Sequence, residues 1–393
     1  MEIKKRVDFD NLEIAFGAKN DRALKKTHFV FSTMKSNALV KVGTTLTKLA
    51  LKSGLPVKGI IKQTLFNIFC GGENIEDCLS TVAQMKKFSV GAILDYSVEG
   101  EKTEAGFEAT TKEILQVITQ AGKSDNIPFA AFKITGLGDF DLLAKIHAGK
   151  KLSSEEQDAW KRVEERTERI CELAHELDVP VLIDAEETWI QKPIDELTIS
   201  MMKKYNQQKG LVYYTFQMYC HSMLDNLKRL HQEAVEAGYI LGAKLVRGAY
   251  MEKERDRASE KQYQDPIQPD KASTDRDYDA ALDYCIEHIS EISLFAGSHN
   301  EQSNYHLAAL MDQKHMAPDD ARVCFAQLYG MSDNISYNLA NAGYNVAKYV
   351  PYGPIKAAMP YLFRRAEENT SVKGQSGREL TLITRELKRR KQR

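Results

Sequence analysis

Residues 361–369 (YLFRRAEEN) contain the strongest candidate for chemistry in this sequence. The segment lies in an apolar-periodic run after Pro354, so it is predicted to be helical. On a helix, Tyr361, Arg364, Arg365 and Glu368 fall at i, i+3, i+4 and i+7 and share one face. Two adjacent guanidinium groups on one face repel each other unless an anion binds between them, and the planar arginine fork suits a carboxylate. A solvated surface helix is the commoner explanation of an isolated arginine pair, so the rest of the chain must decide.

Eight short apolar segments after residue 88 must build the scaffold for this pair. These predicted strands span 90–97, 128–135, 179–186, 211–219, 242–250, 293–299, 323–330 and 345–352. Helical patterns at 155–177, 221–237, 275–290, 300–313 and 332–341 alternate with them. Segments that are apolar on both faces indicate buried parallel strands, and eight such units predict an α/β fold, a distorted (β/α)8 barrel. An open doubly wound sheet is the alternative, but the even spacing favours closure.

The segments outside the barrel are expected to be helical. Helical periodicity at 24–34, 38–51 and 60–69 predicts an all-helical N-terminal region over 1–88. The predicted barrel covers 89–370, and its polar stretch 252–274 is expected to form a long loop after the fifth strand. Residues 371–393 form a basic tail, which we expect to be a solvated helix face rather than a binding arm.

Composition excludes several classes of function. A net charge of -1 and a pI near 6.8 give no electrostatic footprint for nucleic acid. The six cysteines show no CxxC and no zinc spacing, so we predict reduced thiols and no metal site. The sequence has no stretch long enough to cross a bilayer, and its N-terminus lacks a hydrophobic signal core. We therefore expect a soluble, cytoplasmic protein.

Polar residues recur where the predicted strands end. Barrel enzymes carry their chemistry at these carboxyl ends. The candidates are Asp95, Glu99, Lys133, Asp184, Glu186, Glu187, Gln217, Tyr219, Lys244, Arg247, Tyr250, His299, Asn300, Gln327 and Tyr349. Each one has a structural explanation when taken alone: Asp184 could cap a helix, and His299 could be an ordinary core histidine. Their recurrence at one depth of the barrel favours an active site.

The residue types narrow the chemistry. The sequence shows no Gly-x-Ser-x-Gly elbow and no paired Cys and His at sensible positions, and Gly136-Leu-Gly138 lacks the third glycine of a dinucleotide fingerprint. The remaining set is cationic and amide-rich. Such groups bind anions and can hold a delocalised ring that gains negative charge, which indicates a cofactor that performs redox chemistry.

Four of these stretches resemble signatures of the proline dehydrogenase family, in the same order. They are 182–187 (LIDAEE), 244–250 (KLVRGAY), 349–354 (YVPYGP) and 361–369 (YLFRRAEEN), and the resemblance covers roughly residues 89–370. It implies a distorted barrel that binds FAD noncovalently and oxidises L-proline to Δ1-pyrroline-5-carboxylate, with hydride passing to flavin N5 and electrons to a membrane quinone. The wording of 244–250 is similar to the stand-alone, eukaryotic-like branch.

The resemblance also implies a role for each matching position. The proline carboxylate would be held by Lys133, Arg364 and Arg365, with Glu368 orienting the two guanidinium groups. The pyrrolidine ring would be enclosed by Leu245, Tyr250, Tyr349 and Tyr361. Contacts to FAD would come from Asp184, Gln217, Lys244, Arg247, Gly248 and Ala249, with His299 and Asn300 near its phosphate or adenine side. Asp184 would in addition support Lys133.

Some alternatives stay open. Bifunctional bacterial members have arginine at the position of Lys244 and lysine at that of Arg247, so the residue that donates to flavin N5 is not assigned. Hydroxyproline dehydrogenase is the nearest rival activity, although that branch tends to have a smaller residue at the position of Tyr349. A nonenzymatic anion-binding barrel is a rival from another class, and a phosphate-binding isomerase barrel has weak support from the glycines near 330 and 353. The N-terminal helices or the basic tail could touch a membrane peripherally.

Overall fold

The centre of the molecule is a closed barrel of eight parallel strands in sequential order. The computed structural model describes residues 6–34, 58–97, 101–371 and 375–392, except the side chains of 58, 60, 366–371, 375 and 376. The strands are β1 (Val90–Tyr96), β2 (Phe129–Phe132), β3 (Val181–Ile183), β4 (Val212–Gln217), β5 (Leu241–Val246), β6 (Ile292–Gly297), β7 (Val323–Leu328) and β8 (Val346–Tyr352). The predicted barrel is confirmed, and the open sheet is excluded because β1 pairs with β8.

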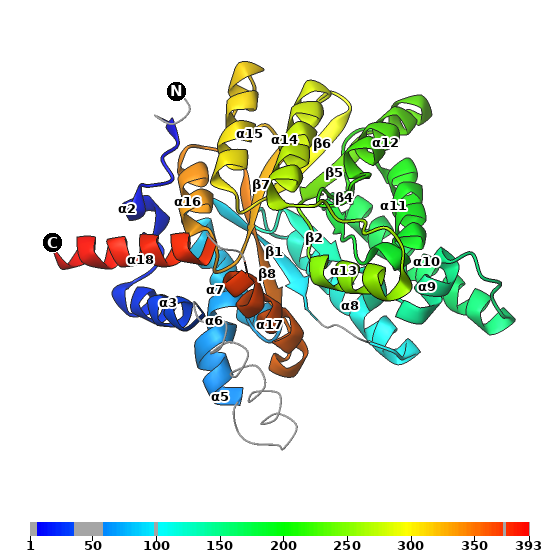
Figure 1. Ribbon diagram of the computed structural model, residues 1–393, viewed down its shortest axis with the longest axis horizontal. Coiled ribbons are helices and arrows are strands. Elements are labelled where there is room, and N and C mark those ends of the chain that lie inside the picture. Colours follow the sequence, from blue (N-terminus) through cyan, green and yellow to red (C-terminus); the bar gives the residue numbers. More distant parts are fainter. Residues whose placement is uncertain (1–5, 35–57, 98–100, 372–374, 393) are drawn as a thin grey trace.

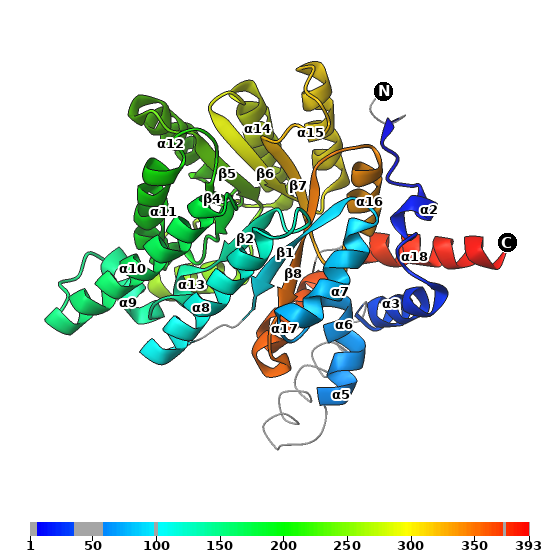
Figure 2. The same ribbon diagram turned by 180° about the vertical axis from the view of Figure 1, so that it is seen from behind.

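Helices surround the strands and alternate with them along the chain, as Figures 1 and 2 show from opposite sides. They are α8 (Glu104–Ala121), α9 (Phe140–His147), α10 (Ser154–Glu176), α11 (Gln191–Tyr205), α12 (Met223–Ala237), α14 (Lys271–Glu287), α15 (Glu301–Gln313), α16 (Asp333–Asn341) and α17 (Ile355–Ser371). Local signals set several helix starts. For example, Ser153 and Glu156 form a capping box at α10, in which each side chain bonds to the other's backbone N–H.

Strand alternation divides the core into an inner and an outer layer. The inner layer fills the barrel with residues that include Ile93, Phe129, Leu182, Phe295 and Tyr349. The outer layer joins the other face of the strands to the surrounding helices. Because successive side chains of a strand point to opposite faces, the register decides which polar residues enter the barrel.

The segment after β5 differs from the prediction of a long loop over 252–274. Residues Met251–Lys261 form helix α13, and α14 already begins at Lys271. The helix is strongly polar, but Glu254 and Ala258 are buried one turn apart on one face. The Glu254 carboxylate accepts hydrogen bonds from the backbone N–H and the hydroxyl of Thr188, both 2.7 Å long. Because the buried face of α13 carries a charged residue, the segment lacks the apolar periodicity from which a helix is predicted.

The N-terminal segment and the C-terminal helix form a second core beside the barrel. Their elements in this core are α2 (Leu12–Ala15), α3 (Asp21–Met34), α5 (Lys58–Ile61), a π-helical turn (Lys62–Phe66), α6 (Asn67–Phe69) and α18 (Gln375–Lys391). Helix α7 (Ile75–Lys86) follows them in the chain, but its buried side chains pack in the outer layer of the barrel core. In Figures 1 and 2, α18 lies beside α2 and α3. The helices expected at 24–34 and 60–69 are confirmed, whereas the helix expected at 38–51 lies outside the described residues.

The basic tail is helical, as predicted, but it is not a fully solvated face. Leu382 and Ile383 of α18 are buried in the second core. Arg385 pairs with Asp10 at 2.8 Å, and Arg390 donates to Asp21 at 2.9 Å. Much of the tail's positive charge is therefore paired with acidic residues of the N-terminal segment. Among the described residues, none of the helices combines the length and apolar character needed to cross a bilayer.

Candidate active site

A buried ionic cluster lies at the carboxyl ends of four strands. Lys244 of β5 faces the barrel interior and donates from Nζ to Asp184 Oδ1 at 2.5 Å and to the Tyr349 hydroxyl at 2.8 Å. Lys133 Nζ lies 3.8 Å from the other carboxylate oxygen of Asp184. Burial and the nearby carboxylates of Asp184 and Asp95 raise the pKa of Tyr349 well above its ordinary value. Tyr349 therefore stays a neutral phenol, and Asp184 is the carboxylate that both lysines share.

Helix α17 follows β8 and carries the arginine pair. Arg365 is 7% exposed, and its guanidinium carbon lies 5.3 Å from the centre of the buried Tyr361 ring. Arg364 is half-buried. A carboxylate site requires that the two arginines do not simply extend into bulk solvent. The burial of Arg365 and the partial burial of Arg364 meet this requirement. The side chain of Glu368 lies outside the described part of α17.

Arg247 is held away from the lysine cluster by groups around the start of α15. Its Nε donates to Asp275 at 2.7 Å, and its two terminal nitrogens donate to the hydroxyls of Ser298 and Ser303 at 2.8 and 2.9 Å. Asn300 caps α15 by accepting from the backbone N–H groups of Gln302 and Ser303. A guanidinium group, hydroxyls and a helix N-terminus together provide donors that suit a phosphate.

His299 joins β6 to the start of α16. Its Nδ1 lies 2.9 Å from the hydroxyl of Ser332. Burial, together with the positive charges of Lys348, Arg365 and Arg247, lowers the pKa of His299 to about 3. The imidazole is therefore neutral at physiological pH and can act as a hydrogen-bond donor and acceptor without adding charge.

This shifted pKa predicts an acid-sensitive fold. The unfolded chain protonates His299 below pH ~6.5, whereas the folded protein resists protonation down to about 3, so stability is present above pH ~6.5 and is lost as the pH falls. We expect His299→Asn, whose amide can replace Nδ1, to flatten the plot of unfolding free energy against pH between about 4 and 6. The slope should fall by up to ~1.4 kcal/mol per pH unit, measured by urea unfolding. Equal slopes in variant and wild type would show that His299 is protonated normally.

The remaining candidates lie near these groups. Gln217 at the end of β4 donates to the backbone carbonyl of Glu186 at 2.8 Å. Burial raises the pKa of Glu186 to about 7, although hydrogen bonds from Thr135 act in the opposite direction. Tyr250 is half-buried at the start of α13, while Gly248 and Ala249 are exposed. Gly248 has a φ of +136°, and a Cβ there would lie 2.5 Å from the Tyr219 ring, so only glycine fits.

One expected role does not agree with the structure. Leu245 was expected to enclose the substrate ring, but it is fully buried in the outer layer between strands and helices. Its neighbour Lys244 points into the barrel, so strand alternation turns Leu245 outward. The resemblance to the family identified Leu245 by its position in the sequence, but it did not show on which face of β5 the side chain lies.

The donors at the strand ends fit FAD. Lys244 offers an ammonium group inside the barrel, and Arg247, Ser298 and Ser303 offer donors at a helix N-terminus. Gly248 lets the backbone pass close to an aromatic ring at the strand end. These groups match a ring that accumulates negative charge and a diphosphate, the two anionic parts of the cofactor.

The sequence did not identify several residues that hold the site. They are Asp275, Ser298, Ser303 and Ser332, which bond to Arg247 or His299. Ser298 follows β6, so the rule that flagged polar strand ends could have found it. Asp275 falls in the helix predicted at 275–290, where a charged residue is most simply read as solvated.

Fold and site together define a (β/α)8 barrel enzyme with its polar centre at the strand ends. A solved structure of proline utilization A from Bdellovibrio bacteriovorus, inactivated by N-propargylglycine, covers 94% of this chain with a TM-score of 0.72 and 21% identity. That likeness concerns the fold, and it spans 40% of that chain. The family model for proline dehydrogenase matches residues 78–378. The chain therefore belongs to the proline dehydrogenase family, a family of FAD-dependent oxidoreductases.

Two curated relatives illustrate the range of similar proteins. The carbapenem antibiotics biosynthesis protein CarD from Pectobacterium carotovorum subsp. carotovorum is 34% identical over 335 residues, which are 85% of this chain and 86% of CarD. Mitochondrial proline dehydrogenase 1 from Caenorhabditis elegans is 41% identical over 246 residues, which are 61% of this chain and 40% of that protein. This chain thus spans most of one relative and less than half of the other.

Proposed function

We propose that this protein oxidises L-proline to Δ1-pyrroline-5-carboxylate with noncovalently bound FAD and passes the electrons to a membrane quinone. The observation that carries the proposal is the convergence of Lys133, Asp184, Lys244 and Tyr349 from four strands at the carboxyl end of the barrel. Family membership supports the same reaction class.

The substrate carboxylate is assigned to the cationic side chains. Arg365, Arg364 and Lys133 hold it, because guanidinium groups bind a carboxylate through paired hydrogen bonds and an ammonium group adds charge. Burial of Arg365 strengthens this interaction by excluding water. The side chains of Tyr250, Tyr349 and Tyr361 line the substrate ring, and Glu368 is assigned to orient the arginines.

The lysine cluster is assigned to the redox step. Bound FAD would supply the two-electron acceptor for oxidation of the ring carbon–nitrogen bond. Lys244 stabilises negative charge that develops beside it, and Asp184 and Tyr349 hold its ammonium group in place. Arg247, His299 and Asn300 are assigned to the phosphate side, and Gln217 and Ala249 to further cofactor contacts. The different surroundings of Lys244 and Arg247 support this division of roles. Lys244 enters the barrel and is assigned to the ring that gains charge, whereas Arg247 lies at the start of α15 and is assigned to the phosphate side.

Substrate choice tests this proposal. The hydroxyl of Tyr349 is fixed by Lys244, so the ring cannot easily move to admit a substituent on proline. We expect kcat/KM for L-proline to exceed that for trans-4-hydroxy-L-proline by about 10-fold or more, with a ubiquinone analogue as acceptor. Tyr349→Ser should narrow this ratio. Equal turnover of both substrates by the wild type would reject proline as the preferred substrate, and a lack of reaction with the quinone analogue would reject that acceptor.

A further inference from the structure

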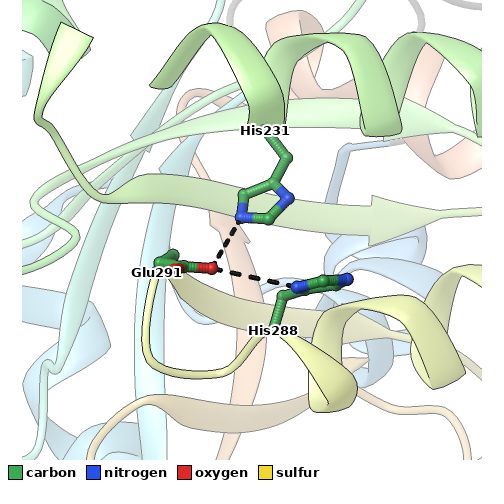
Figure 3. A group of neighbouring side chains, drawn as sticks. All are labelled: His231, His288 and Glu291. Atoms are coloured by element: carbon green, nitrogen blue, oxygen red, sulfur yellow. Dashed lines mark hydrogen bonds and ion pairs between the residues drawn. The ribbon is translucent and has the colours of Figure 1, made fainter. Parts of the chain in front are cut away.

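Two histidines and a glutamate meet at the opposite end of the barrel from the candidate active site. His231 projects from α12, His288 follows the end of α14, and Glu291 precedes the first residue of β6 (Figure 3). Their ligand atoms all lie within 4.8 Å of one another, and among the described residues this is the group of this kind that could hold a metal ion. Because β6 begins at Ile292, the group lies at the amino ends of the strands, where barrels carry features that serve stability.

The distances are close to those of a metal site. His231 Nε2 lies 3.1 Å from Glu291 Oε2, and His288 Nδ1 lies 3.8 Å from the same oxygen. Ligand atoms around a tetrahedral zinc ion lie about 3.3 Å apart, given metal–ligand bonds of about 2.0–2.1 Å. The His288 side chain is 36% exposed, so a small rotation of its ring is possible without disturbing the core.

The backbone holds two of the three ligands in place. The N–H groups of Glu291 and Ile292 both donate to the carbonyl of His288, at 3.0 and 3.1 Å. Leu241 at the start of β5 donates to the carbonyl of Glu291 at 2.9 Å. The turn from His288 to Glu291 is therefore fixed before any ion binds, which reduces the entropy lost on binding.

The third ligand is oriented through its other ring nitrogen. His231 is 4% exposed, and its Nδ1 lies 2.8 Å from the hydroxyl of Tyr284. A hydroxyl can donate or accept, so Tyr284 can accept from Nδ1–H and leave the Nε2 lone pair directed at a metal. Metal-ligating histidines typically have such a partner.

The surroundings are electrostatically mixed. Lys228 lies one turn before His231 on α12, with its ammonium nitrogen 6.0 Å from the centre of the Tyr284 ring. Glu287 adds a carboxylate near the same tyrosine. Arg322 donates to the carbonyl of Ile289 at 3.5 Å, and it is paired with Asp320 at 2.6 Å. With Glu291 included, three carboxylates face two cations, so a divalent cation is not opposed by a local excess of positive charge.

We propose that His231, His288 and Glu291 form a zinc site that joins α12, α14 and β6 at the base of the barrel. Two imidazoles and a carboxylate suit zinc, with water as the fourth ligand. Zinc binds the lone pair of His231 Nε2, and the single ring proton of the neutral imidazole stays on Nδ1, where it is donated to the Tyr284 hydroxyl. The site was not predictable from spacing, because His231 is far from His288 and Glu291 along the chain.

Zinc content and thermal stability test this proposal on the FAD-loaded protein after chelator treatment and dialysis. After incubation with zinc chloride and gel filtration, we expect about one zinc ion per chain. His288→Ala and Glu291→Gln should lose it, and both side chains are exposed enough to be changed without a buried cavity. At free zinc about 100 times above the Kd, the unfolding equilibrium constant of the wild type should fall about 100-fold, with a higher Tm.

A matched histidine provides the control. His306 Nε2 lies 2.8 Å from Asp283 Oδ1, and both side chains are exposed. This pair offers two potential metal ligands, whereas the proposed site offers three. His306→Ala should keep the zinc content and the zinc-dependent rise in Tm, and all variants should keep their FAD. Wild-type protein that retains much less than one zinc ion, or His288→Ala and Glu291→Gln variants that retain as much as the wild type, would overturn the proposal.

Discussion

Arg365→Met raises the KM for L-proline by about 100- to 1000-fold while FAD stays bound. Truncation of one partner in a buried charge pair costs about 2–5 kcal/mol, and ~1.4 kcal/mol corresponds to a factor of ten in affinity. Methionine preserves much of the volume against Tyr361 but removes the guanidinium group that we assign to the substrate carboxylate. Steady-state kinetics, together with the flavin absorbance of the purified variant, measure the effect.

Arg385→Met is the matched control for this variant. Arg385 lies on α18, its side chain is 50% exposed, and it pairs with the exposed Asp10. An exposed pair of this kind contributes about 0–1 kcal/mol, so its loss should leave the KM for proline unchanged. If Arg365→Met binds proline as tightly as the wild type, Arg365 does not hold the substrate.

Asp184→Ala destabilises the protein by about 3–5 kcal/mol and strongly reduces kcat. The change leaves Lys244, with a side chain 6% exposed, without its carboxylate, and removes the partner of Lys133 as well. Among the described residues, the Tyr349 hydroxyl would then remain as the hydrogen-bond partner of the Lys244 ammonium group. Urea unfolding of the FAD-loaded protein measures the stability change.

A double variant separates charge imbalance from lost packing. Asp184→Ala combined with Lys244→Met removes both charges, so it should be more stable than Asp184→Ala alone, because the two sites interact directly. The control is Glu165→Ala, which removes one partner of the exposed pair with Lys161 and should cost about 0–1 kcal/mol. Additive losses in the double variant would contradict a tightly coupled buried pair.

The barrel could be predicted because its signals are local and repeated. Each strand is a short β-rich run, and helical patterns recur between the strands, so eight units were visible before any contact was known. Helix α13 was missed because its buried face carries Glu254, whose burial depends on Thr188 far away in sequence. The contacts of α18 were missed for a similar reason, since Asp10 and Asp21 lie at the other end of the chain.

The site was predictable in its members but not in its connections. Polar strand ends identified Lys133, Asp184, Lys244 and Tyr349, which do meet, although their roles stay predictions. Sequence could not show that Lys244 enters the barrel while Leu245 faces outward, because register and alternation depend on the closed sheet. Nor could it show that Arg247 turns toward Asp275, a residue of α14.

Anaerobic titration of the FAD-loaded protein with L-proline tests the central claim most directly. If the cationic groups at the strand ends bind proline beside the flavin, stoichiometric bleaching of the oxidised flavin absorbance should follow proline addition. The reduced flavin should regain its colour when a quinone analogue is added without oxygen. A flavin spectrum that stays unchanged at saturating proline would contradict the account.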